Sequence, residues 1–360
     1  MVQSFFSVLN YYRHFRHFAI TLPLEKKQLP GIDSKHPYDQ LTPDFVLDAV
    51  ESLGLETDFR ILALNSYENR VYQIGIEEGL PIIAKFYRPL RWSPEAILEE
   101  HQFTRALAEH DISVVSPMLI HDSTLHEYQG FHFALFPRQG GHAPEVEVAD
   151  TLFRIGRNIG RIHQASGQEP FKHRKTLSIQ EWARQSRAYL LQENFIPASL
   201  IPAYQSLSQD LVDKMQSIWD SHPVALRKLH GDCHLGNILW RDDVAHFVDF
   251  DDCMNGPAIQ DIWLLLSGDR QQQTAQIIEI LEGYEEFCEF DPRQLNLIET
   301  LRTMRMMNYS AWLARRWSDP AFPMFFPWFN TERYWSDHIL ELREQLAILT
   351  EPPLQLAPGY

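Results

Sequence analysis

The chain has few cysteines, which excludes a fold held together by disulfides. Only three occur among the 360 residues, at Cys233, Cys253 and Cys288. Three thiols cannot form a complete set of disulfides, and no two of them make a CxxC pair. This usage is typical of a reducing compartment, so we expect a cytoplasmic protein.

Long hydrophobic runs and an excess of positive charge are also missing. No apolar run approaches the roughly 20 residues that a membrane-spanning helix needs. The chain has 48 acidic and 32 basic side chains and a formal net charge of −16. Such a field repels nucleic acid and anionic lipid. We therefore expect neither nucleic acid nor a membrane as partner, and because no heptad run indicates an oligomer, we expect a monomer.

The first 35 residues are aromatic and mildly basic. Arg13, His14, Arg16 and His17 interrupt the apolar run, and no small-residue cleavage site follows, so a secretory signal is not indicated. Two interpretations remain: an amphipathic docking segment, or a leader without order that comes from an upstream start codon. We assign residues 1–40 to a leader and linker.

The next hundred residues alternate between helical and strand patterns. Apolar spacing predicts a helix over 43–54, and Ser93-Pro94 is a normal start for a second helix. Runs rich in β-type residues, bounded by polar turns, predict an antiparallel meander and two further strands. The predicted strands are 60–64, 71–76, 82–86, 114–120 and 131–136.

After Pro137 the pattern becomes mostly helical. Asp150 is expected to cap the first helix, and one short β-hairpin is predicted, with arms at 237–240 and 245–250. The aromatic stretch 317–328 either lines a pocket or packs loops onto the helices. The later helices are expected near 179–192, 208–220, 259–266, 274–288, 294–317 and 332–347.

The stretch "LHGDCHLGNILW", residues 229–240, concentrates polar groups between apolar flanks. A structural zinc site at His230, Cys233 and His234 would need a fourth ligand, usually from a second Cys-rich pair, and none lies nearby. A Cys233–His nucleophile pair is a weaker signal. The third interpretation is the catalytic loop of a phosphotransferase.

That third interpretation accounts for more of the chain. The pattern HxDxxxxN, a hairpin and "VDFDD" supply Asp232, Asn237 and Asp249, and phosphoryl transfer needs such carboxylate and amide oxygens. Lys85 in the strand "IIAKFY" can reach nucleotide phosphates, and Glu100 on the next helix can hold it. Each residue alone has an ordinary structural explanation. Together, in this order, they indicate a kinase that uses ATP and Mg²⁺.

Three motifs resemble one known family. "HGDCHLGNILW", "FVDFDD" and "GPAIQDIW" are similar to the motifs of the aminoglycoside phosphotransferase and choline kinase branch of the protein-kinase-like superfamily. Within it, the chain from about residue 38 to 360 resembles bacterial Ser/Thr protein kinases of the stress response. The resemblance implies an α+β, two-lobed protein-kinase-like fold, with a small antiparallel-sheet N-lobe (41–137) and a mostly helical C-lobe (138–360).

The resemblance also implies a role for each matching residue. Glu99 is the rival of Glu100, but it points about 100° away round the helix. The segment 136–139 would be the hinge that receives adenine. The implied site residues are Asp232 as catalytic base, Asn237 and Asp249 as Mg²⁺ ligands, Lys85 braced by Glu100 on the α- and β-phosphates, Ser66 on the phosphates, and His230 and Asp261 as residues that orient the loop.

Two departures from the usual protein-kinase pattern bear on the substrate. "NSYENR" replaces the GxGxxG loop, so Asn65, Ser66 and Asn69 would have to cradle phosphate. The segment from Asp249 to Asp261 is too short for an activation loop, so phosphorylation there cannot be the switch, and the platform for a peptide is reduced.

Three functions therefore compete. The first is a Ser/Thr protein kinase, with the enzyme itself among the candidate acceptors. The second is a small-molecule kinase for an amino alcohol, a sugar or homoserine, for which the acidic stretch 249–252 and the aromatic stretch 317–328 would suit a cationic substrate. The third is a pseudokinase or binding module, which the intact Lys85, Asp232, Asn237 and Asp249 oppose.

Overall fold

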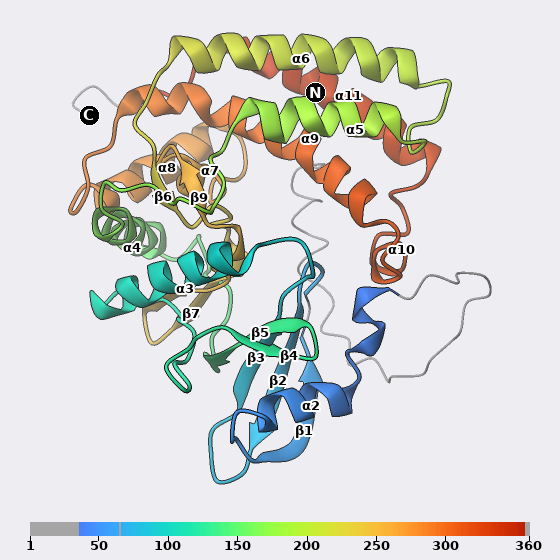
Figure 1. The fold of residues 1–360 in the computed structure, drawn as a ribbon. Coiled ribbons are helices and arrows are strands. Elements are labelled where there is room, and N and C mark those ends of the chain that lie inside the picture. Colours follow the sequence, from blue (N-terminus) through green and yellow to red (C-terminus); the bar gives the residue numbers. More distant parts are fainter. Residues whose placement is uncertain (1–35, 65, 357–360) are drawn as a thin grey trace.

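The computed structural model describes residues 36–64 and 66–356. A small lobe built on a sheet lies below a larger helical lobe, as Figure 1 shows. This is the α+β, kinase-like arrangement that the sequence predicted. Among the described residues, none of the helices combines the length and the apolar character needed to cross a membrane.

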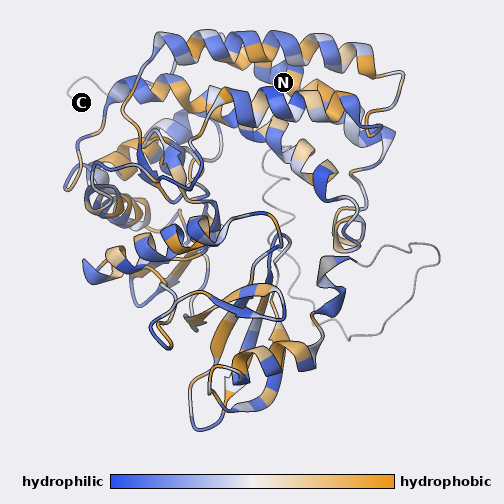
Figure 2. Cartoon of the chain, viewed as in Figure 1, coloured by the Kyte–Doolittle hydropathy of each residue, from blue (hydrophilic) through white to orange (hydrophobic). Residues whose placement is uncertain are grey.

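The N-lobe is a five-stranded antiparallel sheet in the order β1-β2-β3-β5-β4. Helix α2 (Pro43–Glu51) covers it, and its buried Val46 and Val50 belong to one hydrophobic cluster with Phe86 and Phe133 of the sheet. In Figure 2 hydrophobic residues colour much of this sheet. The strands are β1 (Thr57–Ala63), β2 (Arg70–Ile76), β3 (Ile82–Phe86), β4 (His126–Tyr128) and β5 (Phe131–Pro137).

Helix α3 (Pro94–Glu109) begins where the sequence predicted. The Ser93 hydroxyl accepts a hydrogen bond from the backbone N–H of Ala96, and Pro94 takes the first helical position. A serine cap satisfies one of the free N–H groups at a helix start, and proline there loses no hydrogen bond. The cap fixes the start of the helix that carries Glu99 and Glu100.

The predicted strand over 114–120 is wrong. The segment makes only single bridges, and the Val115 N–H donates to the Phe247 carbonyl of the other lobe at 3.0 Å. The Met118 N–H donates to the Leu135 carbonyl of β5 at 2.7 Å, so the segment links the sheet to the other lobe without forming a strand. The edge strand is β4, which the sequence did not indicate.

The assignment of residues 1–40 to a leader and linker is wrong for its last residues, 37–40. Residues 1–35 lie outside the described residues. A 3₁₀ turn (Pro37–Gln40) packs on the N-lobe. Tyr38 is buried, and its hydroxyl donates to the Glu68 carbonyl at 3.0 Å. The described fold therefore includes residues that the sequence assigned to the linker.

The C-lobe is mostly helical, with two small two-stranded sheets, β6 (Arg227–Leu229) with β9 (Met254–Gly256) and β7 (Ile238–Arg241) with β8 (Val244–Phe247). The β7–β8 pair is the predicted hairpin, and its turn residues Asp242 and Asp243 have φ of 50° and 60°. The α-helices are α4 (Thr151–Ala165), α5 (Ser186–Gln192), α6 (Ile201–Ser221), α7 (Gln260–Trp263), α8 (Arg270–Tyr284), α9 (Ile298–Arg316), α10 (Ala321–Phe325) and α11 (Glu332–Ile348).

Local differences from the predicted helices are small. Asp150 precedes α4 but makes no side-chain cap, and a π-helical turn (Gln180–Gln185) opens the helix that ends with α5. Helix α6 begins earlier than predicted, because Pro202 occupies the first helical turn, where proline is tolerated.

Helices α4 and α8 approach closely because glycines line their contact. A Cβ atom on Gly156 would overlap the Ile280 carbonyl, and one on Gly283 would overlap the Phe153 carbonyl. Only a residue without a side chain allows the backbones this near. The contact holds His163 of α4 against Tyr284 of α8.

Most aromatic side chains of the stretch 317–328 pack in or against the hydrophobic core, whereas Phe325 is exposed. Phe322 and Phe326 are buried, and the Trp312 and Phe322 ring centroids lie 5.0 Å apart. Tyr67 of the N-lobe contacts Phe326 at 5.0 Å between centroids. Of the two interpretations, the packing one agrees with the structure, and the packing includes the other lobe.

Candidate functional site

Asp232 lies on a loop between β6 and a 3₁₀ turn (Leu235–Asn237). Gly231, next to it, has φ of +86°, and a Cβ atom there would overlap the Asp252 carbonyl. Glycine is therefore the residue that allows the loop to turn against the 249–252 segment. The Asn237 amide donates to the Asp232 carbonyl at 3.0 Å and closes the loop.

Asp261 anchors this loop through hydrogen bonds to its backbone. Its carboxylate accepts hydrogen bonds from the backbone N–H groups of His230 and Gly231, each at 2.8 Å. The side chain is 1% exposed. A buried carboxylate with two backbone donors is a strong, charge-assisted anchor. The structure therefore ties Asp261 to the two residues that precede Asp232.

His163 is a further partner that the sequence did not single out. Its Nε2 lies 3.0 Å from the Asp261 carboxylate, and its Nδ1 lies 3.0 Å from the Tyr284 hydroxyl. Burial lowers the pKa of His163, with Asp261 opposing. A neutral imidazole whose Nε2 donates to Asp261 and whose Nδ1 accepts from Tyr284 satisfies every group. The only sequence signal was a histidine on the apolar face of a helix.

The Asp232 carboxylate is not alone. Arg305 of α9 donates to its Oδ1 at 2.7 Å, and His234 Nε2 lies 3.5 Å from its Oδ2. Burial alone would raise the pKa of Asp232, but Arg305 and His234 outweigh it and hold that pKa well below its usual value. The carboxylate is therefore ionised across the physiological range. Arg305 was not found from the sequence.

Lys85 meets three carboxylates. Its Nζ lies 3.1 Å from Asp249, 3.3 Å from Asp251 and 3.8 Å from Glu100. Burial would lower the pKa of Lys85, but these carboxylates raise it well above its usual value, so the amine is charged. Burial raises the pKa of Glu100 to about 7, with Lys85 opposing. The structure thus brings the predicted lysine to the predicted Asp249 and Glu100.

Glu99 points elsewhere. Its carboxylate accepts hydrogen bonds from the backbone N–H groups of three consecutive residues, Lys172, His173 and Arg174, at 2.6, 2.8 and 2.9 Å. It therefore ties α3 to the C-lobe. Of the two rivals, Glu100 is the one beside Lys85.

The acidic stretch 249–252 is neutralised by N-lobe cations. Arg91 pairs with both Asp251 and Asp252, and Lys85 pairs with Asp249 and Asp251. Asp249 itself has φ of 59°, a backbone conformation that non-glycine residues rarely adopt. These pairs weaken the idea that the stretch attracts a cationic substrate.

The turn before β2 is partly structural. The Ser66 hydroxyl donates to the Asn69 carbonyl at 3.1 Å. Asn69 is buried, and its side-chain oxygen accepts from the Arg88 N–H at 3.1 Å. Asn69 therefore supports the turn from inside, which disagrees with its expected role in cradling phosphate; Asn65 lies outside the described residues.

Five charged residues and a tryptophan form what we call the lobe-bridging network. They are Glu68, Asp319, Arg70, Arg88, Arg316 and Trp312. Glu68, in the turn, accepts from Trp312 Nε1 at 2.6 Å and lies 2.7 Å from Arg316. Asp319 lies 2.7 Å from Arg88. The network joins the N-lobe turn to α9 and the segment after it.

The cysteine interpretation gains no support. Burial raises the pKa of the Cys233 thiol well above its usual value, and the thiolate is the reactive form. His230 Nε2 lies 2.9 Å from the Val248 carbonyl, which occupies one of its two nitrogens. Within residues 36–64 and 66–356, no group of three or more His, Cys, Asp or Glu side chains is arranged to hold a metal by itself.

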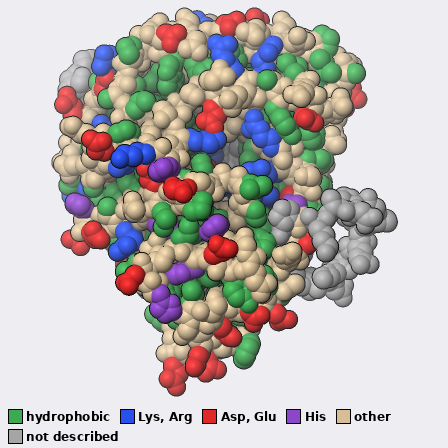
Figure 3. Space-filling model, viewed as in Figure 1, with side chains coloured by type: hydrophobic (Ala, Val, Ile, Leu, Met, Phe, Trp, Pro, Cys, Tyr) green, Lys and Arg blue, Asp and Glu red, His purple; other side chains and the backbone are tan. Residues whose placement is uncertain are grey.

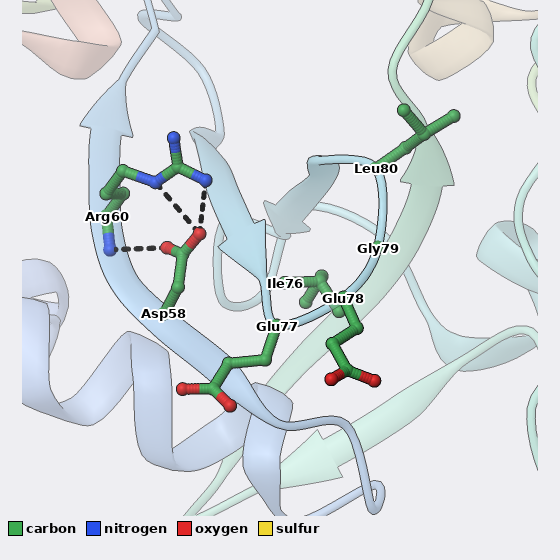
Figure 4. Close-up of a pocket in the computed structure, with 7 residues that line it drawn as sticks. All are labelled: Asp58, Arg60, Ile76, Glu77, Glu78, Gly79 and Leu80. Atoms are coloured by element: carbon green, nitrogen blue, oxygen red, sulfur yellow. Dashed lines mark hydrogen bonds and ion pairs between the residues drawn. The ribbon is translucent and has the colours of Figure 1, made fainter.

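A surface pocket on the N-lobe lies outside this site. Figure 4 shows it between β1 and the turn after β2, with Asp58 bonded to Arg60 and with Glu77 and Glu78 at its rim. Acidic side chains gather at the same lower end of the molecule in Figure 3. The pocket is lined by none of the predicted site residues.

Comparisons with known proteins agree with this geometry. Residues 60–298 match the model of a phosphotransferase enzyme family. Stress response kinase A of Shigella flexneri is 45% identical over 328 residues, 91% of this chain and 99% of that protein. The protein of Salmonella typhimurium named Serine/threonine protein kinase RdoA is 43% identical over the same shares.

Solved structures share the fold. A complex of amicoumacin kinase hAmiN with AMP-PNP, Ca²⁺ and Ami matches with a TM-score of 0.69 and 22% identity, over 88% of this chain and 95% of that one. A microcompartment-associated aminopropanol kinase matches with a TM-score of 0.62 and 17% identity, over 84% and 96%. With relatives named kinase over nearly its whole length, the chain belongs to the phosphotransferase enzyme family and is a kinase that transfers phosphate to a hydroxyl group.

Proposed function

We propose that the protein is an ATP- and Mg²⁺-dependent Ser/Thr protein kinase that acts in the cytoplasm as part of a stress response. One observation carries the choice of a protein acceptor, namely the 43% identity, over 91% of the chain, to a relative named a serine/threonine protein kinase. The acceptors include the enzyme itself, and the enzyme acts as a monomer.

In this proposal Asp232 is the catalytic base. An ionised carboxylate on a fixed loop can orient the acceptor hydroxyl and accept its proton. The low pKa of Asp232, caused by Arg305 and His234 against the effect of burial, supports the ionised form. Lys85, charged and held by Glu100, contacts the nucleotide phosphates, and Ser66 contacts them from the turn.

Asn237 and Asp249 would hold the Mg²⁺ ion. The Val248 N–H donates to the Asn237 carbonyl at 3.0 Å, so the two residues lie at adjoining ends of the hairpin strands. An amide oxygen and a carboxylate are the hard donors that Mg²⁺ takes, with positions left for phosphate and water. The Asp249 side chain is 56% exposed and so accessible to an ion. When bound, the ion neutralises phosphate charge.

A small-molecule kinase is the second candidate. The observation that favours it is the short connection from Asp249 to Asp261, which holds only a 3₁₀ turn, β9 and the start of α7. A protein acceptor has little platform there. The acceptor in this candidate is an amino alcohol, a sugar or homoserine.

Transfer of labelled γ-phosphate from Mg²⁺-ATP tests the proposal. The wild type and Asp232→Asn are incubated with a generic Ser/Thr protein and with a pool of small hydroxyl metabolites. We expect label in protein, a loss of about 10²–10⁴-fold in the variant, and unchanged nucleotide affinity. Asp249→Ala should instead weaken Mg²⁺-ATP binding.

Asp243→Asn, at the exposed hairpin turn, is the matched control and should keep wild-type turnover. Label found only in a metabolite would favour the second candidate. Normal turnover of Asp232→Asn would show that the catalytic base is another residue.

A further inference from the structure

Helix α9 presents one polar stripe to the catalytic loop and the N-lobe. Arg305, Tyr309, Trp312 and Arg316 follow the spacing i, i+4, i+7 and i+11, which puts them on one side of a helix. All four are half-buried, whereas the face of α9 that carries Met304 is fully buried. The stripe is therefore the side of α9 that faces out of the core.

The two ends of this stripe contact the two parts of the site. At one end Arg305 donates to Asp232 Oδ1 at 2.7 Å. At the other end Trp312 and Arg316 bond to Glu68 of the turn before β2. The rise of an α-helix separates the ends by about 16 Å. An acceptor whose hydroxyl lies at Asp232 must lie beside this stripe.

The acidic side chains near that position are paired with cations, and Asp232 itself is paired with Arg305. The neighbouring carboxylates Asp249, Asp251 and Asp252 are paired with N-lobe cations, and Glu68 is paired with Arg316. The cation closest to the reactive carboxylate is the Arg305 guanidinium, whose side chain is 29% exposed. A cationic acceptor would meet like charge here, whereas an anionic one would meet a planar donor suited to carboxylate or phosphate.

We propose that Arg305 is the specificity-determining residue of the acceptor side, and that it selects Ser or Thr hydroxyls next to an acidic residue in a peptide segment. This rests on the proposed function. The acidic group of the acceptor replaces Asp232 as the partner of the Arg305 guanidinium. The Asp232 carboxylate then accepts a hydrogen bond from the acceptor hydroxyl. Before the acceptor arrives, the same guanidinium holds Asp232 in place.

The test compares three peptides that differ only beside the Ser, with Asp, Ala or Lys as its neighbour, using the full chain and Mg²⁺-ATP. We expect the wild type to prefer the Asp peptide by about 10-fold or more in kcat/KM, the usual value of one charged hydrogen bond. Arg305→Gln should lose this preference through KM for the Asp peptide, and Arg305→Glu should reverse it toward the Lys peptide.

Two controls separate specificity from folding. Arg315→Gln changes an exposed arginine on the same helix and should keep the wild-type preference. In Arg305→Gln the acidic limb of the pH–rate profile should move to higher pH, because the pKa of Asp232 loses its main lowering partner. That shift checks the contact of Arg305 with Asp232, whereas the choice among the three peptides checks its contact with the acceptor.

The outcomes distinguish this inference from the proposed function. Equal rates on all three peptides, unchanged in Arg305→Gln, would overturn the inference and leave a protein kinase. If no peptide is labelled, small acceptors are tested instead. Label in glycerate that is lost in Arg305→Gln would support the selection of an anionic acceptor by Arg305. The same result would refute a protein as the acceptor. Label in choline or ethanolamine would refute both.

Discussion

Replacing Asp261 with Asn keeps the shape of the side chain and removes its charge. In the wild type the carboxylate accepts from the backbone N–H groups of His230 and Gly231 and from His163 Nε2. An asparagine offers one oxygen and one NH₂ group. Because the carboxylate is fixed between donors on both oxygens, the NH₂ group must face at least one N–H and leave it unpaired.

The size of the effect follows from these contacts. A buried donor left without a partner costs about 1–3 kcal/mol, and hydrogen bonds to a neutral amide are weaker than those to a carboxylate. Since the side chain is 1% exposed, water cannot replace the lost bonds. Asp261→Asn should therefore lower the free energy of unfolding by about 2–4 kcal/mol, a large share of a typical total of about 5–15 kcal/mol.

Urea unfolding and phosphate transfer, measured on the same preparations, check this. Turnover should fall in the folded variant as well, because the loop that carries Asp232 loses its anchor. Asp243→Asn makes the same chemical change at a 79% exposed side chain and should stay within about 0.5 kcal/mol. If Asp261→Asn were as stable and as active as that control, the anchoring role would be refuted.

Three other predictions concern the fold around the site. The pKa of Glu100 is about 7, above its usual 4.5, so the stabilisation from its bound proton is complete below about pH 4.5 and is lost as the pH rises through about 7. Glu100→Gln should therefore flatten the dependence of Tm on pH in that window, and an unchanged slope would contradict the burial argument. Gly156→Ala should destabilise by about 1–3 kcal/mol in thermal unfolding, because the added Cβ atom forces α4 and α8 apart, and a more stable variant would show that the helices can separate freely. Arg316→Gln should cost about 1–2 kcal/mol in urea unfolding, since it removes a charged partner of the half-buried Glu68, and no change would mean that the pair contributes nothing.

The sequence predicted those parts of the fold whose partners are local. The strands 71–76 and 82–86 and the Ser93-Pro94 helix start were confirmed, because turn residues and caps act within a few positions. The segment 114–120 looked like a strand for the same reason. Its hydrogen bonds are divided between Phe247 of the other lobe and Leu135 of β5, and no local pattern contains that information.

The candidate site shows the same division. The order of Lys85, Asp232 and Asp249 along the chain is enough to indicate a kinase. Arg305 lies 73 residues from Asp232 along the chain and His163 lies 98 residues from Asp261, each on a helix with an ordinary amphipathic pattern. Their roles depend on how α9 and α4 pack, which spacing alone does not predict.

The lobe-bridging network has a consequence for modularity. The family model ends at residue 298, yet Trp312, Arg316 and Asp319 lie beyond that point and complete the surroundings of the N-lobe turn. A fragment cut at that boundary would expose Glu68 and Arg88 without their C-lobe counterions. The final helices and the N-lobe should therefore be inherited, exchanged and engineered together, as one unit.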